Sequence, residues 1–368
     1  MEPSCGNPEV IGLLETYLRT AKERNFGSVA VVMTAYPNIA AVDFAGDVAL
    51  EQATLDALGL ASKKVEASIA NWTLPPRDEL LDASYHCYNL ANSPLGFDFL
   101  TWLVEAEMTR VREGAPAPLK IGFYFGTDGR AERVAYRRAF LDNIFRPLLS
   151  LIGAVEDSAA IRGRHKHYFV GRDIVAAARA GERVPLLAAP PLAGKYLDLL
   201  WTGYRLSLQP PVTITLRESG HWPHRNSNVD AWFRFALYLK EKGERVVFIR
   251  DTQRAVEPLP MFPVIGPAAT DVRIRMALYE RARANLFVSN GPATLALFSE
   301  RPFLQFIRVE PPDSAANFNT AKFWAESMGV PVGEQYPWSA PDQRLVFKPD
   351  DYDNIVQAWE EFISAPRR

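Results

Sequence analysis

The chain has 368 residues, of which 48% are hydrophobic and 23% are charged, with a formal net charge of −2 and only two cysteines. This composition predicts a globular protein of two domains of ~150 to 200 residues, and it excludes overall charge as a means of binding nucleic acid. Cys5 and Cys87 are too few and too far apart for a disulfide framework or a zinc site, which favours a reducing compartment, the cytoplasm.

The first half of the chain alternates between helical and strand patterns. Helices are predicted over residues 10–24, 51–72, 97–113 and 132–152, and strands over residues 28–34, 85–90 and 119–125. Arg146 and Pro147 are expected to interrupt the last helix, because proline removes a backbone donor and crowds the preceding turn. Strands that alternate with helices predict a parallel sheet.

Residues 156–211 carry a weak pattern broken by prolines and are interpreted as the region between the domains, with a strand over 167–170 and a helix over 172–180. A second series follows, with strands over 212–216, 245–249, 285–289 and 303–307 and helices over 229–242, 272–283 and 292–300. The chain is therefore predicted to be an α/β protein with domains 1–190 and 191–350. Residues 351–368 hold a helix over 352–363 that is expected to cross back to the first domain.

No stretch of the sequence has the pattern of a membrane-spanning helix or a secretory signal. The apolar runs are shorter than the ~20 residues that span a bilayer, and the first residues lack the basic and apolar regions of a signal peptide. Any membrane contact is expected to be peripheral.

The strand over 285–289 ends in a turn that leads directly into a helix. Gly291 permits a tight turn, and Pro292 suits a first helical position. Free amides and the helix dipole at such a junction favour a phosphate, and a strand's carboxyl end is where open α/β sheets bind ligands. The alternative is a Gly-Pro turn that binds nothing. The candidate binding residues are Ser289, Asn290, Gly291, Pro292, Ala293 and Thr294.

The loop after the strand over 212–216 gathers polar side chains at a second strand end. Arg217 and Arg225 suit a diphosphate, because guanidinium donors match phosphate oxygens in pairs, and Asn226 is a further candidate. Ser227 or Asn228 is expected to cap the following helix. The alternative for the arginines is a solvated loop with surface ion pairs.

The histidines do not predict a metal site. His221 and His224 are three residues apart in a loop that contains proline, and the sequence fixes no third ligand beside them. His165 and His167 belong to a basic segment that is interpreted as a solvated face.

Several aspartates are expected at strand ends or in loops, where a carboxylate could take a proton from a ligand hydroxyl. Asp98, Asp47 and Asp128 are candidate catalytic bases, of which only one is expected to act. Asp128 also fits a turn, since Asp before Gly is favoured there, and Asp98 could instead support the helix that begins near it. Their spacing does not select among them.

Two segments carry a resemblance to a known family. SNGPATLALFSERPFLQF is similar to the donor-site segment of the heptosyltransferase and fucosyltransferase-like branches of the GT-B glycosyltransferases, and TLRESGHWPHRNSN is similar to their arginine-bearing loop. The chain departs from the heptosyltransferase pattern at Ser289 and Asn290, where those proteins have Asp and Thr or Ser, and the histidine that follows in them is absent.

The resemblance implies two Rossmann-like domains that face a central cleft. The second domain would bind a nucleotide-sugar donor, and the first would bind a glycan, lipid-linked or protein acceptor. Transfer to an acceptor hydroxyl would invert the anomeric centre without a metal or cofactor, and it would serve bacterial surface-glycan synthesis. A sugar-nucleotide epimerase of the same fold and a non-catalytic, two-lobed ligand-binding protein are the alternatives.

Overall fold

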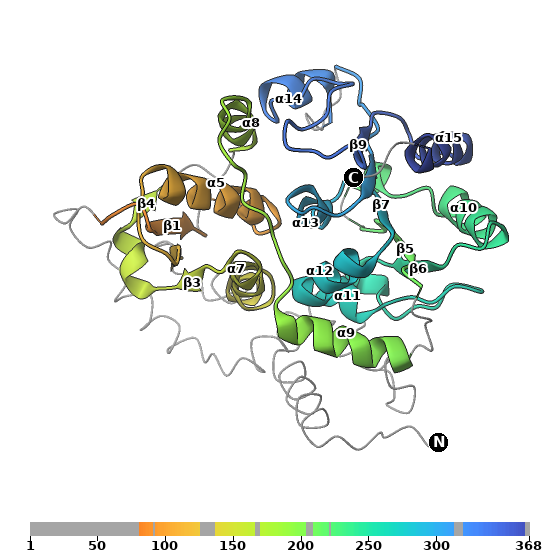
Figure 1. The fold of residues 1–368 in the computed structure, drawn as a ribbon, viewed down its shortest axis with the longest axis horizontal. Helices are drawn as coiled ribbons and strands as arrows, with labels where there is room; N and C mark the ends of the chain where they lie inside the picture. Colours follow the sequence, from red (N-terminus) through yellow and green to blue (C-terminus); the bar gives the residue numbers. More distant parts are fainter. Residues whose placement is uncertain are drawn as a thin grey trace.

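The computed structural model describes residues 81–90, 93–125, 137–165, 170–203, 209–220, 222–312 and 319–364. The elements expected over 10–24, 28–34 and 51–72, most of the strand over 167–170, and the candidate bases Asp47 and Asp128 lie outside these residues. The described elements form two parallel sheets that lie in separate units, each with helices against it (Figure 1).

The first sheet has four parallel strands in the order β3-β2-β1-β4. Its strands are β1 (Tyr85–Asn89), β2 (Lys120–Tyr124), β3 (Val155–Glu156) and β4 (Arg164–His165). Its helices are α5 (Asp98–Arg112), η1 (Leu141–Phe145), α7 (Arg146–Ile152), η2 (Ser158–Arg162) and α8 (Gly171–Arg179). The predicted strands over 85–90 and 119–125 and the predicted helices over 97–113 and 172–180 are thereby confirmed.

Aromatic side chains pack around the start of α5. Phe99 contacts Phe145 and Tyr88 with ring centroids 4.5 and 4.8 Å apart, and Trp102 lies 5.0 Å from Tyr88. These rings are fully buried, and such pairs add to the stabilisation that burial alone gives. The start of α5 is therefore packed against β1 and η1.

The helix predicted over 132–152 changes form beside Arg146 and Pro147 in the described part, but the chain stays helical there. Residues 137–152 are helical throughout, but residues 141–145 form a π turn directly before α7, and Pro147 lies in the first turn of α7. The wider π turn leaves room for the proline ring, which a regular α turn would crowd.

The second sheet has five parallel strands in the order β6-β5-β7-β8-β9. They are β5 (Val212–Thr215), β6 (Val246–Ile249), β7 (Ala284–Val288), β8 (Phe303–Phe306) and β9 (Gln343–Val346). The helices are α9 (Pro191–Gly203), α10 (Val229–Glu241), α11 (Pro267–Thr270), α12 (Val272–Arg281), α13 (Ala293–Leu297), α14 (Ala321–Glu326) and α15 (Tyr352–Ile363). The elements predicted for this half are confirmed, and Asn228 caps α10 by accepting a hydrogen bond from the Ala231 amide.

The strand order places a switch point between β5 and β7. A single parallel bridge between Phe248 and Val264 adds a minimal strand beside β6, so the order along the sheet reads 3-2-1-4-5-6, that of a doubly wound fold. Connections leave β5 toward one side and β7 toward the other, which opens a crevice at their carboxyl ends. The two loops singled out in the sequence begin there.

The segment that joins the domains is hydrogen-bonded to both of them. The Leu187 amide donates to the Phe298 carbonyl at 2.8 Å, and the Ala188 amide donates to the Leu151 carbonyl at 2.9 Å. The next helix, α9, lies against α12 (Figure 1). These contacts hold the two sheets in one arrangement.

The carboxyl-terminal helix does not cross back to the first domain, which corrects that expectation. Helix α15 packs on α10 of the second domain (Figure 1). The ring centroids of Trp359 and Phe235 lie 6.0 Å apart, and both residues belong to one hydrophobic core cluster of the second domain. The apolar side chains of α15 are buried in that core.

Candidate active site

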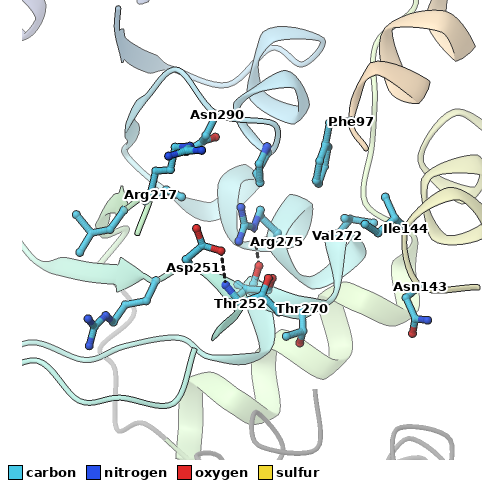
Figure 2. A pocket seen from close by; sticks show the side chains of 16 residues that line it. Phe97, Asn143, Ile144, Arg217, Asp251, Thr252, Thr270, Val272, Arg275 and Asn290 are labelled. Atoms are coloured by element: carbon cyan, nitrogen blue, oxygen red, sulfur yellow. Dashed lines mark hydrogen bonds between the residues drawn. The ribbon is translucent and has the colours of Figure 1, made fainter. Parts of the chain in front are cut away.

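A pocket lies at the switch point of the second sheet and extends to the first domain (Figure 2). Most of its polar lining comes from the second domain: Arg217, Arg250, Asp251, Thr252, Thr270, Arg275 and Asn290. Phe97, Asn143 and Ile144 line it from the first domain. The pocket encloses about 130 Å³, less than the ~300 to 1,000 Å³ of pockets for drug-sized ligands, so a nucleotide-sized substrate would extend beyond it.

The loop after β5 holds the Arg217 side chain at this pocket. Nη1 of Arg217 donates to the Asn226 side-chain oxygen and to the Trp222 carbonyl, the latter at 3.0 Å. Asn226 also spans the loop by bonding both backbone groups of Ser219. Asn226, predicted to bind the sugar donor, therefore positions the Arg217 side chain. Burial lowers the pKa of Arg217, and the charge of Asp251 opposes that shift.

Arg225 lies beside Arg217 in a smaller adjoining cavity, which Asn226 and Ser289 also line. Its Nη2 donates a long hydrogen bond of 3.4 Å to the Ser289 carbonyl, and its buried Nε has no partner among the described residues. Burial lowers the pKa of Arg225, the like charge of Arg217 lowers it further, and Glu310 and Asp98 oppose the shift. This cation is close to another cation and has no ion pair within 4.0 Å in the described part of the chain.

Arg250, in contrast, is fully engaged by a carboxylate. Its Nη2 and Nε donate to the two Glu218 oxygens at 2.5 and 2.8 Å, and both side chains are only 6% exposed. The pair ties the end of β5 to the end of β6. Arg250 is thus neutralised within the protein, although it lines the pocket.

Sequence reasoning missed Arg275, which lies in the middle of the pocket view (Figure 2). It is 4% exposed on α12, its Nε donates to the Ala268 carbonyl at 2.5 Å, and its Nη1 has no partner in the described structure. A signal was present in the sequence. Val272, Arg275 and Tyr279 recur at helical spacing on the buried face, so an arginine replaces an apolar residue there.

Two amides of the turn after β7 are engaged within the turn itself, whereas the expected phosphate-binding role of residues 289–294 stays a prediction. The Asn290 side-chain oxygen accepts from the Ala293 amide at 2.9 Å, and the Gly291 carbonyl accepts from the Thr294 amide at 3.1 Å. Asn290 and Pro292 line the pocket, whereas Ala293 is buried and Thr294 is half-buried. The positive charge at the site comes from arginines.

Gly291 has a packing role that the sequence did not reveal. A Cβ added to Gly291 would lie 2.7 Å from Cδ2 of Phe97 and 3.2 Å from its Cβ. Phe97 precedes α5 of the first domain. The absence of a side chain at Gly291 therefore allows the two domains to touch beside the pocket.

We expect Gly291→Ala to lower stability by ~1 to 3 kcal/mol, because overpacking displaces the Phe97 ring. In a Phe97→Ala background the same substitution should have little effect, and thermal unfolding of the four proteins measures this coupling. Gly203→Ala is the control, since nothing lies within 4 Å of its added Cβ. Equal losses in both backgrounds would contradict the contact.

Asp98 is the one candidate base that the described residues place. It is the acidic residue in the first turn of α5, next to the N-cap Phe97, so the alternative that it supports this helix stays open. Its side chain is exposed by surface area, yet the surrounding protein raises the pKa of its carboxyl, and the Arg225 charge opposes that rise. Asp98 and Arg225 thus influence each other across the domain boundary.

No group of three His, Cys, Asp or Glu residues in the described ranges could hold a metal ion. His221 lies outside those ranges, so the predicted absence of a metal remains a prediction. None of the described helices is both long and apolar enough to cross a membrane.

Comparison with known proteins gives fold-level likenesses. No family model and no curated protein sequence matches the chain. It is similar to the structure of ADP-heptose LPS heptosyltransferase II from E. coli, with 12% identity, a TM-score of 0.38, and coverage of 82% of this chain and 80% of that one. It is also similar to a family 9 glycosyl transferase from Veillonella parvula, with 11% identity, a TM-score of 0.33, and coverage of 90% and 86%. Likenesses at these TM-scores carry no argument about the reaction.

Proposed function

We propose that this protein is a GT-B-type glycosyltransferase that moves a hexosyl or heptosyl group from a nucleoside diphosphate sugar to an acceptor hydroxyl. The observation that supports it most is a set of buried and partly buried arginines at the switch point, in a pocket that the first domain also lines. Arg225 and Arg275 each have a buried nitrogen without a partner in the described structure. Unmatched buried cations are unfavourable in the protein alone and are suited to an anionic ligand.

The arrangement fits the chemistry of glycosyl transfer. Negative charge grows on the diphosphate as its bond to the sugar breaks, and fixed guanidinium groups stabilise that charge without the need to reorganise. Arg217 and Arg225 are close enough for the charge of one to lower the pKa of the other, so together they suit a doubly charged leaving group.

The acceptor hydroxyl requires a base on the opposite side of the sugar. Asp98 fits this position, because it begins α5 of the first domain next to Phe97, which lines the pocket, and the Arg225 charge lowers the pKa of its carboxyl. A raised pKa brings an aspartate closer to the value that suits proton abstraction near neutral pH. In-line attack would invert the anomeric centre, and the contact of the domains at Gly291 would limit water at the reacting atoms. The sequence resemblance supports a role in surface-glycan synthesis, and the low cysteine content favours the cytoplasm.

Nucleotide binding is the first test. Calorimetry with ADP, GDP and UDP should show one of them binding in the micromolar range, and a protein that binds none of the three would refute the proposal. Release of that diphosphate from its sugar is then followed with and without glycan, lipid-linked and peptide acceptors. We expect release that depends on an acceptor. Release from the donor alone, with an altered free sugar, would instead identify an epimerase.

A further inference from the structure

A buried ion pair joins the loop that carries Arg217 to the neighbouring strand of the second sheet. Nε and Nη2 of Arg250 donate to the two carboxylate oxygens of Glu218 at 2.8 and 2.5 Å, and both side chains are 6% exposed. An ion pair buried to this degree adds little net stability, because both charges lose their hydration. The pair is therefore better explained by the geometry that it fixes than by stability.

Glu218 is bound to the end of β6 through its backbone as well as its side chain. It follows Arg217 in the loop after β5, and Arg250 follows β6, the parallel neighbour of β5. The Glu218 amide donates to Oδ2 of Asp251 at 3.2 Å, and Asp251 lines the pocket together with Arg217 (Figure 2). These contacts fix the residue after Arg217 on the side of β6.

Further contacts hold Arg217 from within its own loop. Its amide donates to the Ser227 hydroxyl at 2.8 Å, and the Ser227 amide donates to its carbonyl at 2.9 Å. The Trp222 carbonyl accepts from Nη1 of Arg217 at 3.0 Å. Trp222 has a φ of 60°, a left-handed conformation that a bulky residue rarely adopts, so the loop keeps a strained backbone where it meets the guanidinium.

We infer that Glu218 and Arg250 are positioning residues, which hold the loop so that the Arg217 guanidinium has one set place at the donor diphosphate. This inference rests on the proposed function. A guanidinium that is fixed before binding loses less conformational freedom when its ligand arrives. Arg250 acts through Glu218, because Nε and Nη2 are taken by the carboxylate and Nη1 donates to the Glu257 carbonyl at 3.2 Å.

The inference predicts that the ion pair and Arg217 are not independent in binding. Glu218→Leu combined with Arg250→Met leaves neither charge buried without its partner, so this pair variant should fold. Its affinity for the nucleoside diphosphate should fall roughly tenfold, because the ligand must then order the loop. Arg217→Gln alone should lower the affinity by roughly tenfold to a hundredfold. In the Arg217→Gln background the pair replacement should add less than about twofold, because the pair acts through Arg217.

Calorimetry with ADP, GDP and UDP measures the four affinities in the full chain, and thermal unfolding checks that each variant is folded. The matched control is Glu244→Leu combined with Arg283→Met, which removes an ion pair that precedes β6 and β7, at the opposite ends of the strands. Its affinity should stay within about twofold of that of the unaltered protein.

Two results of the cycle would overturn the inference alone. One is an unchanged affinity in the pair variant, and the other is a loss that adds in full to that of Arg217→Gln, as direct binding by Arg250 or a general structural role would give. An unaltered protein that binds none of the three diphosphates would instead refute the proposed function, and the inference with it.

A second measurement needs no variant and so does not depend on how the replacements fold. A crystal of the unaltered protein with the diphosphate that binds is expected to show Arg217 within hydrogen-bond distance of a phosphate oxygen and the Glu218–Arg250 pair intact. Arg250 bonded to the phosphate in place of Glu218, or Arg217 away from the phosphate, would overturn the inference.

Discussion

Replacement of Arg225 by glutamine is expected to lower kcat by about 10²- to 10³-fold, the usual effect of losing one donor that stabilises charge in a transition state. Arg225 has only a 3.4 Å hydrogen bond to the Ser289 carbonyl, so the protein itself does not satisfy its guanidinium. The charge is available to the leaving diphosphate, which is most negative as the sugar departs. Turnover at saturating donor, followed by acceptor-dependent diphosphate release, measures this loss.

Two further variants separate charge from geometry at this position. Arg225→Lys keeps the charge but loses the forked donors, so we expect an intermediate kcat. Arg234→Gln on α10 removes an exposed arginine that stacks on Tyr352, and it should leave kcat within about twofold, as surface substitutions usually do. An Arg225→Gln protein that is folded and keeps full donor affinity and turnover would contradict the role of Arg225.

The second half of the fold could be predicted from sequence because its strands are continuous apolar runs. β5, β6 and β7 are buried along their whole length, and that pattern is visible without a structure. β9 was missed because two of its four residues are polar, and α9 because it begins directly after Pro190, in a stretch interpreted as a linker. Helix α15 was predicted to the residue, but an amphipathic stripe does not identify its partner.

The site was predictable where local chemistry and strand ends coincide. Arg217 and Asn290 follow β5 and β7, and parallel pairing of those strands brings them to one pocket. The close approach of Phe97 to Gly291 depends on how two domains meet, which no local pattern encodes. The use of the turn amides by Asn290 is equally a matter of side-chain geometry.

Asp98→Asn is expected to lower kcat by about 10²- to 10⁴-fold, because the amide cannot accept the acceptor's proton. Diphosphate affinity should stay within about twofold, since the carboxylate does not bind the donor phosphates in this arrangement. Desolvation by the surrounding protein raises the pKa of Asp98, so kcat/KM of the unaltered protein should fall, as pH decreases, at a higher pH than an ordinary aspartate would give. The pH profile of kcat/KM is measured for the unaltered protein and for Asp98→Asn, and the pH at which each profile falls on its acidic side is compared.

The same profile tests whether Asp98 and Arg225 meet across the domains. The Arg225 charge lowers the pKa of Asp98, so its removal in Arg225→Gln should move the acidic limb to still higher pH. Glu107→Gln is the matched control on α5, because Glu107 pairs with Arg110 and should change neither rate nor limb. If Asp98→Asn keeps both its turnover and its acidic limb, the base is another group, and Asp47 and Asp128 become the residues to replace.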